Sequence, residues 1–173
     1  FRSIPGVEIF SPETYTELEE LFCRSVNSRR ISILRYPKGS ERSYDRTDFT
    51  AGEDFDTYNT DGAETVIITY GRITYTAVKA THLLRGSSVK TGIIKLKKLF
   101  PLDPSILKKA VGKADLVYIL EEGVRYGGIG EYIASVLPEK RTSHRKQLPA
   151  ELKRQLKVYM KLMTFQETDK LII

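Results

Sequence analysis

Short apolar runs alternate with helical patterns along most of this chain, and that alternation constrains its fold most strongly. The runs 65–69, 91–96 and 116–120 have the length of strands and are rich in Val, Ile and Leu. The helical segments expected after them are 73–84, 104–111 and one that carries Ile133, Val136 and Leu137. Strands buried on both faces need continuous apolar side chains, and strand–helix repetition is typical of mostly parallel sheets. We therefore expect an α/β protein with a doubly wound sheet.

Residues before position 37 predict a smaller strand–helix–strand unit. The runs 7–10 and 31–34 are expected to be its strands, and the second, β-branched and aliphatic, is expected to be buried. Ser11 is expected to cap the helix between them, with Pro12 at the first helical position. The expected inner face of that helix carries Tyr15, Leu18, Leu21, Phe22 and Val26. This unit is a βαβ motif with a right-handed crossover.

The stretch 38–62 interrupts the pattern. It is rich in Asp, Glu, Ser, Thr and Gly, and its aromatic residues follow no period. A polar stretch of this length is usually a linker or a functional loop, and a short hairpin is expected near 58–63. We therefore divide the chain into a first part at 1–37, a linker at 38–62 and a second domain at 63–173.

Composition narrows the class of protein. With 40% hydrophobic and 29% charged residues among 173, the chain is expected to be globular and to lack a membrane span. Its single cysteine, Cys23, is expected on the apolar side of the first helix, and a lone buried thiol favours a reducing compartment, the cytoplasm. Because Phe1 is not an initiator Met and a strand follows soon after it, we expect a piece of a longer polypeptide.

The formal charge of +6 is concentrated near the end of the chain. From residue 138 onward nine Lys and Arg residues accompany four acidic ones, a net charge of +5, so the preceding part is close to neutral. We therefore expect neither a nucleic-acid partner nor a membrane partner. The segment 149–163 predicts a basic amphipathic helix, which packs on its own domain or binds an anionic surface. Residues 171–173 are a candidate edge strand.

Arg35 is the candidate binding residue. It follows the strand 31–34, and Pro37 then ends any sheet pairing, so the guanidinium is expected at the carboxyl end of a strand. Open α/β sheets bind ligands at that end, and the planar fork of an arginine suits a phosphate or a carboxylate. The alternative is an ion pair between Arg35 and a neighbouring Asp or Glu as the chain leaves the sheet.

Other candidates for chemistry are weaker. The glycines within 127–130 lack the dinucleotide-binding spacing and a phosphate-loop lysine, so we favour a tight turn that lets helix and strand approach closely. Glu121 and Glu122 are expected to point in opposite directions, and to cap the next helix or lie at a subunit interface. His82 and His144 have no partner at catalytic spacing. No catalytic, cofactor-binding or metal-binding residue is therefore assigned in this chain.

Four motifs in order resemble the C-terminal half of thiamine-diphosphate-dependent transketolase-like enzymes, and most closely the 1-deoxy-D-xylulose-5-phosphate synthases. The motifs are 5–12, 33–39, 93–103, and 121–123 together with 127–130. The resemblance covers residues 4–137. It implies that 1–37 end a pyrimidine-binding domain and that 63–173 form a C-terminal domain. That domain would have three α/β/α layers and a mostly parallel sheet with one antiparallel strand.

The resemblance also implies a reaction and a role for Arg35. Such a transferase condenses pyruvate with D-glyceraldehyde 3-phosphate and releases CO₂, and Arg35 would contact the phosphate of the sugar-phosphate substrate. Thiamine diphosphate and Mg²⁺ would be bound by upstream domains, so this segment alone would be inactive. A homodimer is implied. Tyr70-Gly71-Arg72 departs from the Gly-Thr-Gly-like turn of many relatives, and the segment after Leu137 also differs, which leaves the exact substrate pair open.

Alternatives remain within and outside this family. A transketolase proper and the β subunit of a 2-oxo-acid dehydrogenase would share the fold. A stand-alone interaction module that uses the basic tail 138–173 on nucleic acid or an anionic membrane belongs to another class. Steep salt dependence of binding would indicate such a module.

Overall fold

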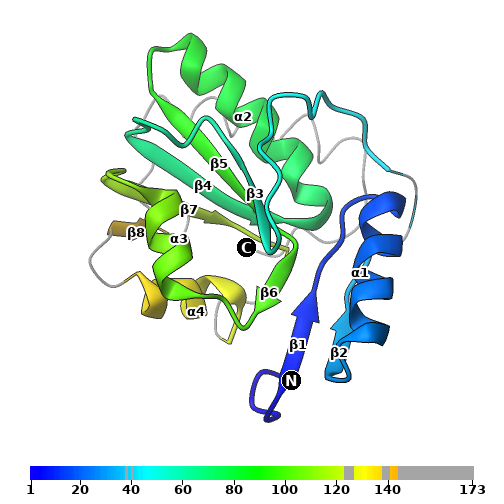
Figure 1. Ribbon diagram of the computed structural model, residues 1–173. Coiled ribbons are helices and arrows are strands. Elements are labelled where there is room, and N and C mark those ends of the chain that lie inside the picture. The colour runs from blue at the N-terminus through cyan, green and yellow to red at the C-terminus, as the bar shows by residue number, and fades with distance from the viewer. Residues whose placement is uncertain (38, 40, 123–126, 138–140, 144–173) are drawn as a thin grey trace.

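Two β-sheets form the core of the computed structural model, which describes residues 1–37, 39, 41–122, 127–137 and 141–143 (Figure 1). The smaller sheet has the order β2–β1–β6. Its strands are β1 (Val7–Phe10), β2 (Ile31–Leu34) and β6 (Lys98–Phe100). β1 runs parallel to β2, and α1 (Tyr15–Asn27) connects them. The predicted strand–helix–strand unit is therefore confirmed.

The larger sheet has the order β3–β5–β4–β7–β8. Its strands are β3 (Phe55–Tyr58), β4 (Thr65–Tyr70), β5 (Thr91–Leu96), β7 (Leu116–Leu120) and β8 (Arg141–Ser143). Every pairing in it is parallel except that of β3 with β5. The prediction of a mostly parallel sheet with one antiparallel strand is confirmed.

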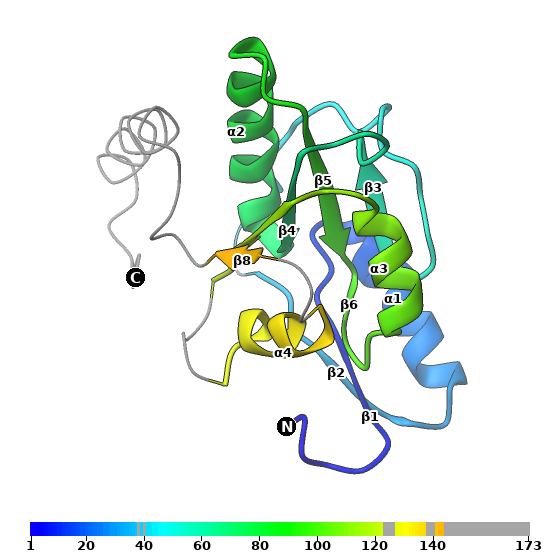
Figure 2. The ribbon, with the colours of Figure 1, turned by 90° about the vertical axis from the view of Figure 1, so that its left-hand side faces the viewer.

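Helices cover both faces of the larger sheet and give this part of the chain three layers (Figure 2). They are α2 (Thr74–Gly86), preceded by the short helix η1 (Gly71–Ile73), and α3 (Pro104–Val111) and α4 (Ile129–Val136). Successive side chains of a strand point to opposite faces, so neighbours on β5 belong to different cores. Ile93 lies in the core with Ala77 of α2, whereas Ile94 lies in the core with Leu107 of α3 and Ile133 of α4.

A single residue, Lys97, separates β5 from β6, although the two strands belong to different sheets. The Lys97 backbone N–H donates to the carbonyl of Asp54 beside the larger sheet at 2.9 Å. The Lys97 carbonyl accepts from the backbone N–H of Ser11, which follows β1, at 2.8 Å. The chain thus passes directly from one sheet to the other, and backbone hydrogen bonds join the sheets at the crossing.

The start of α1 corrects the predicted cap. The helix begins at Tyr15, and its N-cap is Thr14, whose side chain accepts from the backbone N–H of Glu17 at 3.0 Å. Ser11 does not cap the helix and Pro12 does not occupy its first position. The N–H of Ser11 is instead bound at the sheet crossing, and the helix begins only after Thr14, whose backbone is extended.

The predicted burial of the first unit is also corrected. Leu21 is the buried residue of α1, and Cys23 is exposed. The predicted inner face extends too far round the helix, because three of its members are more than half exposed: Tyr15, Phe22 and Val26. β2 is an edge strand rather than a buried one, and Ile31 at its start is 57% exposed.

The segment 41–64 contains β3 and an antiparallel bridge between Thr50 and Thr57, but not the hairpin predicted near 58–63. β3 and β4 are consecutive in the chain, yet β5 lies between them in the sheet, so they cannot pair as predicted near 58–63. The connection passes close to β5 at Gly92, where a Cβ atom would lie 2.7 Å from the carbonyl oxygen of Asn59. Only glycine fits such a close backbone approach. The division of the chain into 1–37, 38–62 and 63–173 stays a prediction.

Three predictions lie outside the residues that the structure describes. They are the amphipathic helix at 149–163, the edge strand at 171–173 and the surroundings of His144. Among the helices of the described ranges, none is long and apolar enough to span a membrane.

Candidate functional site

The backbone of Arg35 is fixed where β2 ends. Its N–H donates to the carbonyl of Phe10 at 2.9 Å, which continues the pairing of β1 and β2 by one residue. The side chain is exposed, as is that of the next residue, Tyr36. Arg35 therefore lies at the carboxyl end of a parallel strand, where the sequence predicts it.

The Arg35 guanidinium contacts two groups of the second part of the chain. Nη1 donates to the phenol oxygen of Tyr70 at 3.1 Å, and Nη2 donates to the backbone carbonyl of Glu122 at 2.7 Å. The guanidinium carbon also lies 5.5 Å from the centre of the Tyr70 ring. A phenol and a backbone carbonyl orient the group without neutralising its charge. The phosphate-binding role of Arg35 stays a prediction.

Tyr70 is the last residue of β4 and is only 5% exposed. Its hydroxyl donates to the Glu121 carboxylate at 3.4 Å. Burial raises the pKa of Tyr70, the charge of Arg35 lowers it and that of Glu121 raises it, and the net result is a raised pKa. The phenol thus keeps its proton and bridges the guanidinium and the carboxylate.

Glu121 caps α4. Capping this helix is one of the two roles that the sequence predicted for Glu121 and Glu122. Its two carboxylate oxygens accept from the backbone N–H groups of Ile129 and Gly130 at 3.0 and 3.2 Å. A carboxylate is stabilised at a helix N-terminus, where N–H groups have no partner within the helix. The consecutive contacts of Arg35, Tyr70 and Glu121 therefore end on the first turn of α4.

The glycines before α4 form a turn, as predicted, but close packing is not the reason for Gly127. Gly127 has φ +74°, a conformation that favours glycine, and a Cβ there would meet nothing within 4 Å. Its N–H donates to the Glu131 carboxylate at 2.6 Å. Protein carboxylates thus take up N–H groups that a phosphate-binding loop would present to its ligand.

The remaining candidates are not brought to this place. His82 is an exposed residue of α2, with its ring stacked on Tyr58 at a centroid distance of 6.2 Å. A surface depression is lined by Tyr36 and Pro37 together with Tyr15 and Leu18 of α1, and Arg35 does not line it. In the described part of the chain, no group of three His, Cys, Asp or Glu side chains is placed to hold a metal ion.

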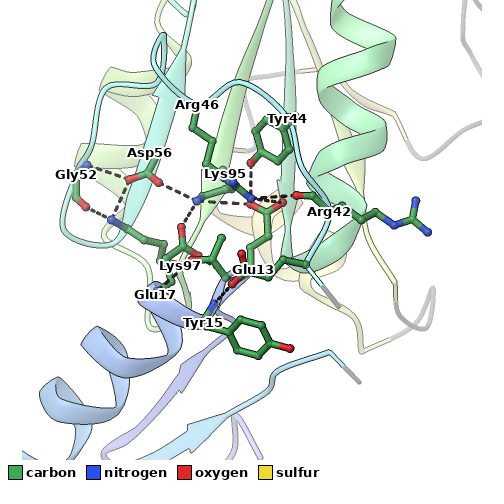
Figure 3. A network of polar contacts seen from close by, with 12 residues as sticks. Glu13, Tyr15, Glu17, Arg42, Tyr44, Arg46, Gly52, Asp56, Lys95 and Lys97 are labelled. Carbon is green, nitrogen blue, oxygen red and sulfur yellow. Dashed lines mark hydrogen bonds and ion pairs between the residues drawn. The ribbon is translucent and has the colours of Figure 1, made fainter. Parts of the chain in front are cut away.

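The structure reveals a second charged site that the sequence analysis missed, a buried ionic cluster between α1, β3 and β5 (Figure 3). Its central residue is Lys95, of which only 3% is exposed. The Lys95 ammonium forms a salt bridge with Glu17 and lies 3.0 Å from Asp56 and 3.7 Å from Glu13. Lys97 adds a second contact to Asp56 at 2.8 Å. The cluster therefore joins the first unit to the larger sheet.

Segment 41–58 closes this cluster. The hydroxyl of Tyr44 donates to Glu13 at 2.7 Å, and Arg46 lies 3.7 Å from the other oxygen of the same carboxylate. The Arg46 guanidinium also stacks on the Tyr44 ring at 4.2 Å. Burial and the neighbouring Glu13 charge raise the pKa of Tyr44 strongly, so its hydroxyl remains protonated and donates.

The electrostatics of the cluster favour ion pairs at its centre. Burial lowers the pKa of Lys95, but the charges of Glu17 and Asp56 outweigh it, and the net pKa is raised. Burial raises the pKa of Asp56, but Lys97 and Lys95 outweigh it, and the net pKa is lowered. For Glu13 burial is the larger effect, and its pKa is raised. Lys95 and Asp56 have close ionic partners inside the protein, so the cluster is suited to a structural role.

Comparison of the sequence with models of protein families gives a match that covers most of the second part of the chain. Residues 57–160 match a model described as the transketolase C-terminal domain. That span is more than half of the 173 residues. It contains β4, β5 and β7, and therefore Tyr70 and Glu121.

Curated relatives carry one name. The chain is 29% identical over 143 residues to the 1-deoxy-D-xylulose-5-phosphate synthase of Caldanaerobacter subterraneus subsp. tengcongensis, an alignment covering 81% of this chain and 23% of that protein. It is 26% identical over 144 residues to the synthase of the same name from Halothermothrix orenii, covering 80% of this chain and 22% of that protein. The chain thus spans less than a quarter of the length of these relatives.

Solved structures give the same fold. One is a split-gene transketolase described as an inactive β4 tetramer, with a TM-score of 0.57 at 17% identity, covering 91% of this chain and 55% of that one. Another is a transketolase mutant from Pichia stipitis in complex with fructose 6-phosphate, with a TM-score of 0.60 at 16% identity, covering 73% of this chain and 20% of that one. Both likenesses concern the fold.

Proposed function

Because this chain belongs to the transketolase C-terminal domain family, we propose that it is part of a 1-deoxy-D-xylulose-5-phosphate synthase-like transferase. The complete enzyme would condense pyruvate with D-glyceraldehyde 3-phosphate and release CO₂. The names of the curated relatives support this choice over a transketolase proper. Residues 1–37 would end the pyrimidine-binding domain that precedes the C-terminal domain.

The observation that carries the proposal is the position of Arg35. Its guanidinium is exposed at the end of β2, and its contacts within the described ranges include a phenol and a backbone carbonyl. The charge is held in place, and a phosphate can accept charge-assisted hydrogen bonds from the planar fork. In this role Arg35 anchors the aldehyde substrate by its phosphate, so that remote binding energy aligns the reacting carbonyl.

We propose that the implied cofactor is bound outside the described residues, and two observations support this. The described residues place no three metal-ligating side chains together, and Glu121 and Glu131 take up N–H groups at the start of α4. Thiamine diphosphate and Mg²⁺ are therefore proposed to bind to other segments or subunits of the enzyme. In this proposal the enzyme is a homodimer of the cytoplasm that takes a keto acid and a sugar phosphate as substrates.

The test is a substitution of Arg35 in the complete enzyme, assayed with pyruvate and D-glyceraldehyde 3-phosphate. Arg35→Met is expected to raise the KM for the aldehyde phosphate by about tenfold to a hundredfold, because a hydrogen bond to a charged group contributes about 1.5–3 kcal/mol. The KM for pyruvate, which has no phosphate, is expected to stay unchanged. Release of CO₂ and formation of the ketose phosphate are measured together.

A matched control removes the cation at the other end of the same strand. Arg30 precedes β2, and its side chain is 59% exposed. Arg30→Met is expected to leave both KM values unchanged. Equal kinetics for Arg35→Met and the unmodified enzyme would return Arg35 to a structural role, and activity with a ketose phosphate donor but not with pyruvate would identify a transketolase instead.

A further inference from the structure

Tyr70 contacts the Arg35 guanidinium, the group to which the proposed function assigns phosphate binding. Arg35 follows β2 of the smaller sheet, whereas Tyr70 ends β4 of the larger one, so their hydrogen bond of 3.1 Å crosses between the two sheets. The ring of Tyr70 is buried and its hydroxyl reaches the exposed arginine. A residue of the C-terminal domain thus contacts the binding group of the first unit.

We propose that Tyr70 is a positioning residue, which holds the Arg35 guanidinium in the orientation that binds the substrate phosphate. The inference rests on the proposed function, and it assigns to the C-terminal domain a part in substrate recognition. An exposed arginine side chain has many rotamers, and a binding site gains affinity when the bound orientation is already populated. The phenol and the Glu122 carbonyl take one N–H from each terminal nitrogen, which selects one orientation.

Glu121 determines which way the Tyr70 hydroxyl points. A phenol has one proton, and here it faces the Glu121 carboxylate at 3.4 Å, which leaves an oxygen lone pair to accept from Arg35. Glu121 is itself fixed by the two N–H groups at the start of α4. The orientation of Arg35 therefore depends on a chain of contacts that begins at a helix end.

A purely structural role for Tyr70 would depend on its ring, whereas the proposed positioning role depends on its hydroxyl. The ring fills space at the end of β4 in the core that includes Ile68 and Leu96. Tyr70→Phe keeps that ring and removes the hydroxyl alone, so it separates the two roles. Tyr118→Phe is the matched control, because Tyr118 is also a buried tyrosine of the larger sheet, and its hydroxyl has no hydrogen-bond partner within the described residues.

The experiment compares these variants in the complete enzyme, with KM measured separately for D-glyceraldehyde 3-phosphate and for pyruvate. Tyr70→Phe is expected to raise the KM for the aldehyde phosphate about fivefold, the size of one hydrogen bond in an exposed site, and to leave kcat and the KM for pyruvate unchanged. Tyr118→Phe is expected to change neither KM. Once Arg35 is replaced by Met, adding Tyr70→Phe is expected to have no further effect, since the two residues would act as one unit.

A second variant approaches the hydroxyl from its other side. Glu121→Gln weakens the acceptor that orients the Tyr70 proton, and it is expected to raise the KM for the aldehyde phosphate about twofold, as loss of a charge from a long hydrogen bond would. This variant keeps the inference testable if Tyr70→Phe does not fold. Unfolding midpoints of all variants show whether each is folded.

The outcomes separate this inference from the proposed function. If Arg35→Met raises the KM for the aldehyde phosphate and neither Tyr70→Phe nor Glu121→Gln does, Tyr70 is not a positioning residue and the proposed function stands. If Tyr70→Phe raises both KM values equally or lowers kcat alone, its role is structural and the inference is overturned. If Arg35→Met itself has no effect on this KM, the proposed function fails first.

Discussion

The buried ionic cluster and the surroundings of Arg35 both join the first unit to the larger sheet, yet they use charge in opposite ways. In the cluster, Lys95 is 3% exposed and contacts the carboxylates of Glu17, Asp56 and Glu13. Arg35 is exposed, and the contacts described above are with the phenol of Tyr70 and a carbonyl oxygen. The difference is in the partners: carboxylates neutralise a cation, whereas neutral oxygens orient it.

This difference favours a structural role for the cluster and supports the proposal that Arg35 binds a ligand. A buried cation without a counter-charge is costly, so the carboxylates around Lys95 are required for it to be there at all. An exposed cation keeps its hydration and its charge, and it can exchange water for an anion from solution. Three predictions test this contrast, in addition to the kinetic tests of Arg35 and Tyr70.

The largest expected effect comes from removing the central cation of the cluster. Lys95→Met leaves Glu17 and Asp56 buried without their partner, and we expect the free energy of unfolding to fall by about 3–5 kcal/mol. Urea unfolding of the full chain measures this loss. The control is Lys113→Met, an exposed lysine in the turn after α3, for which we expect a change within about 0.5 kcal/mol. Equal stability of the two variants would contradict a structural role for the cluster.

The next effect is a pH dependence with opposite signs at two carboxylates. Ion pairs hold the pKa of Asp56 below its ordinary value of 3.8, so its contribution to stability is complete above that pH and is lost as the pH falls through the lowered pKa. Burial holds the pKa of Glu13 above 4.5, so its ionised form costs stability, and this cost disappears as the pH falls through the raised pKa towards 4.5.

Two isosteric variants separate these contributions. The stability advantage of the unmodified chain over Asp56→Asn is expected to shrink on acidification, while its advantage over Glu13→Gln is expected to grow. Unfolding free energies between about pH 3 and pH 7 provide the measurement. Parallel curves for both variants would show that the two carboxylates do not differ in the way that their contacts indicate.

The smallest expected effect is on stability at Arg35. Because the side chain is exposed, Arg35→Met is expected to change the free energy of unfolding by no more than about 0.5 kcal/mol. Together with the loss expected for Lys95→Met, this result would show that folding depends on the cation of the cluster and not on that of Arg35. A loss comparable to that of Lys95→Met would mean that Arg35 is chiefly structural.

Local signals were sufficient for β4, β5 and β7 of the larger sheet and for the helices between them, whereas β3 and β8 were not predicted. The strands at 65–69, 91–96 and 116–120 and the helix that begins after Asp103 were all found, because apolar runs, a capping Asp with Pro and a terminating glycine agree there. The resemblance to transketolase-like enzymes, drawn from motifs within 4–137, is confirmed by the family match.

The misplaced features depend on contacts that lie far apart in the sequence. Ser11 and Pro12 have the local chemistry of a helix start, but the N–H of Ser11 binds the Lys97 carbonyl at the sheet crossing and the helix begins only at Tyr15. Cys23 and the apolar residues of α1 follow the helical period. That period shows which residues share a face of the helix, but it does not show how much of the face is buried against the rest of the protein. Pattern alone therefore gives the existence of α1 but neither its first residue nor its exposed face.

The ionic cluster was missed although a signal for it was present. Lys95 interrupts an apolar strand that the pattern predicts to be buried, and a buried lysine requires a carboxylate nearby. The partners could not be named, because Glu17 and Asp56 come from other elements. Tyr70 was noticed only as a departure from the turn of relatives, since its contact with Arg35 depends on the packing of two sheets.

The crossing at Lys97 has a mechanical consequence. Since β5 continues into β6 after one residue, the two sheets share one continuous stretch of backbone. For the two sheets to rotate relative to each other about this crossing, the pairing of β6 with β1 would have to break. The hydrogen bond between Arg35 and Tyr70 thus spans two sheets that are also covalently continuous through Lys97.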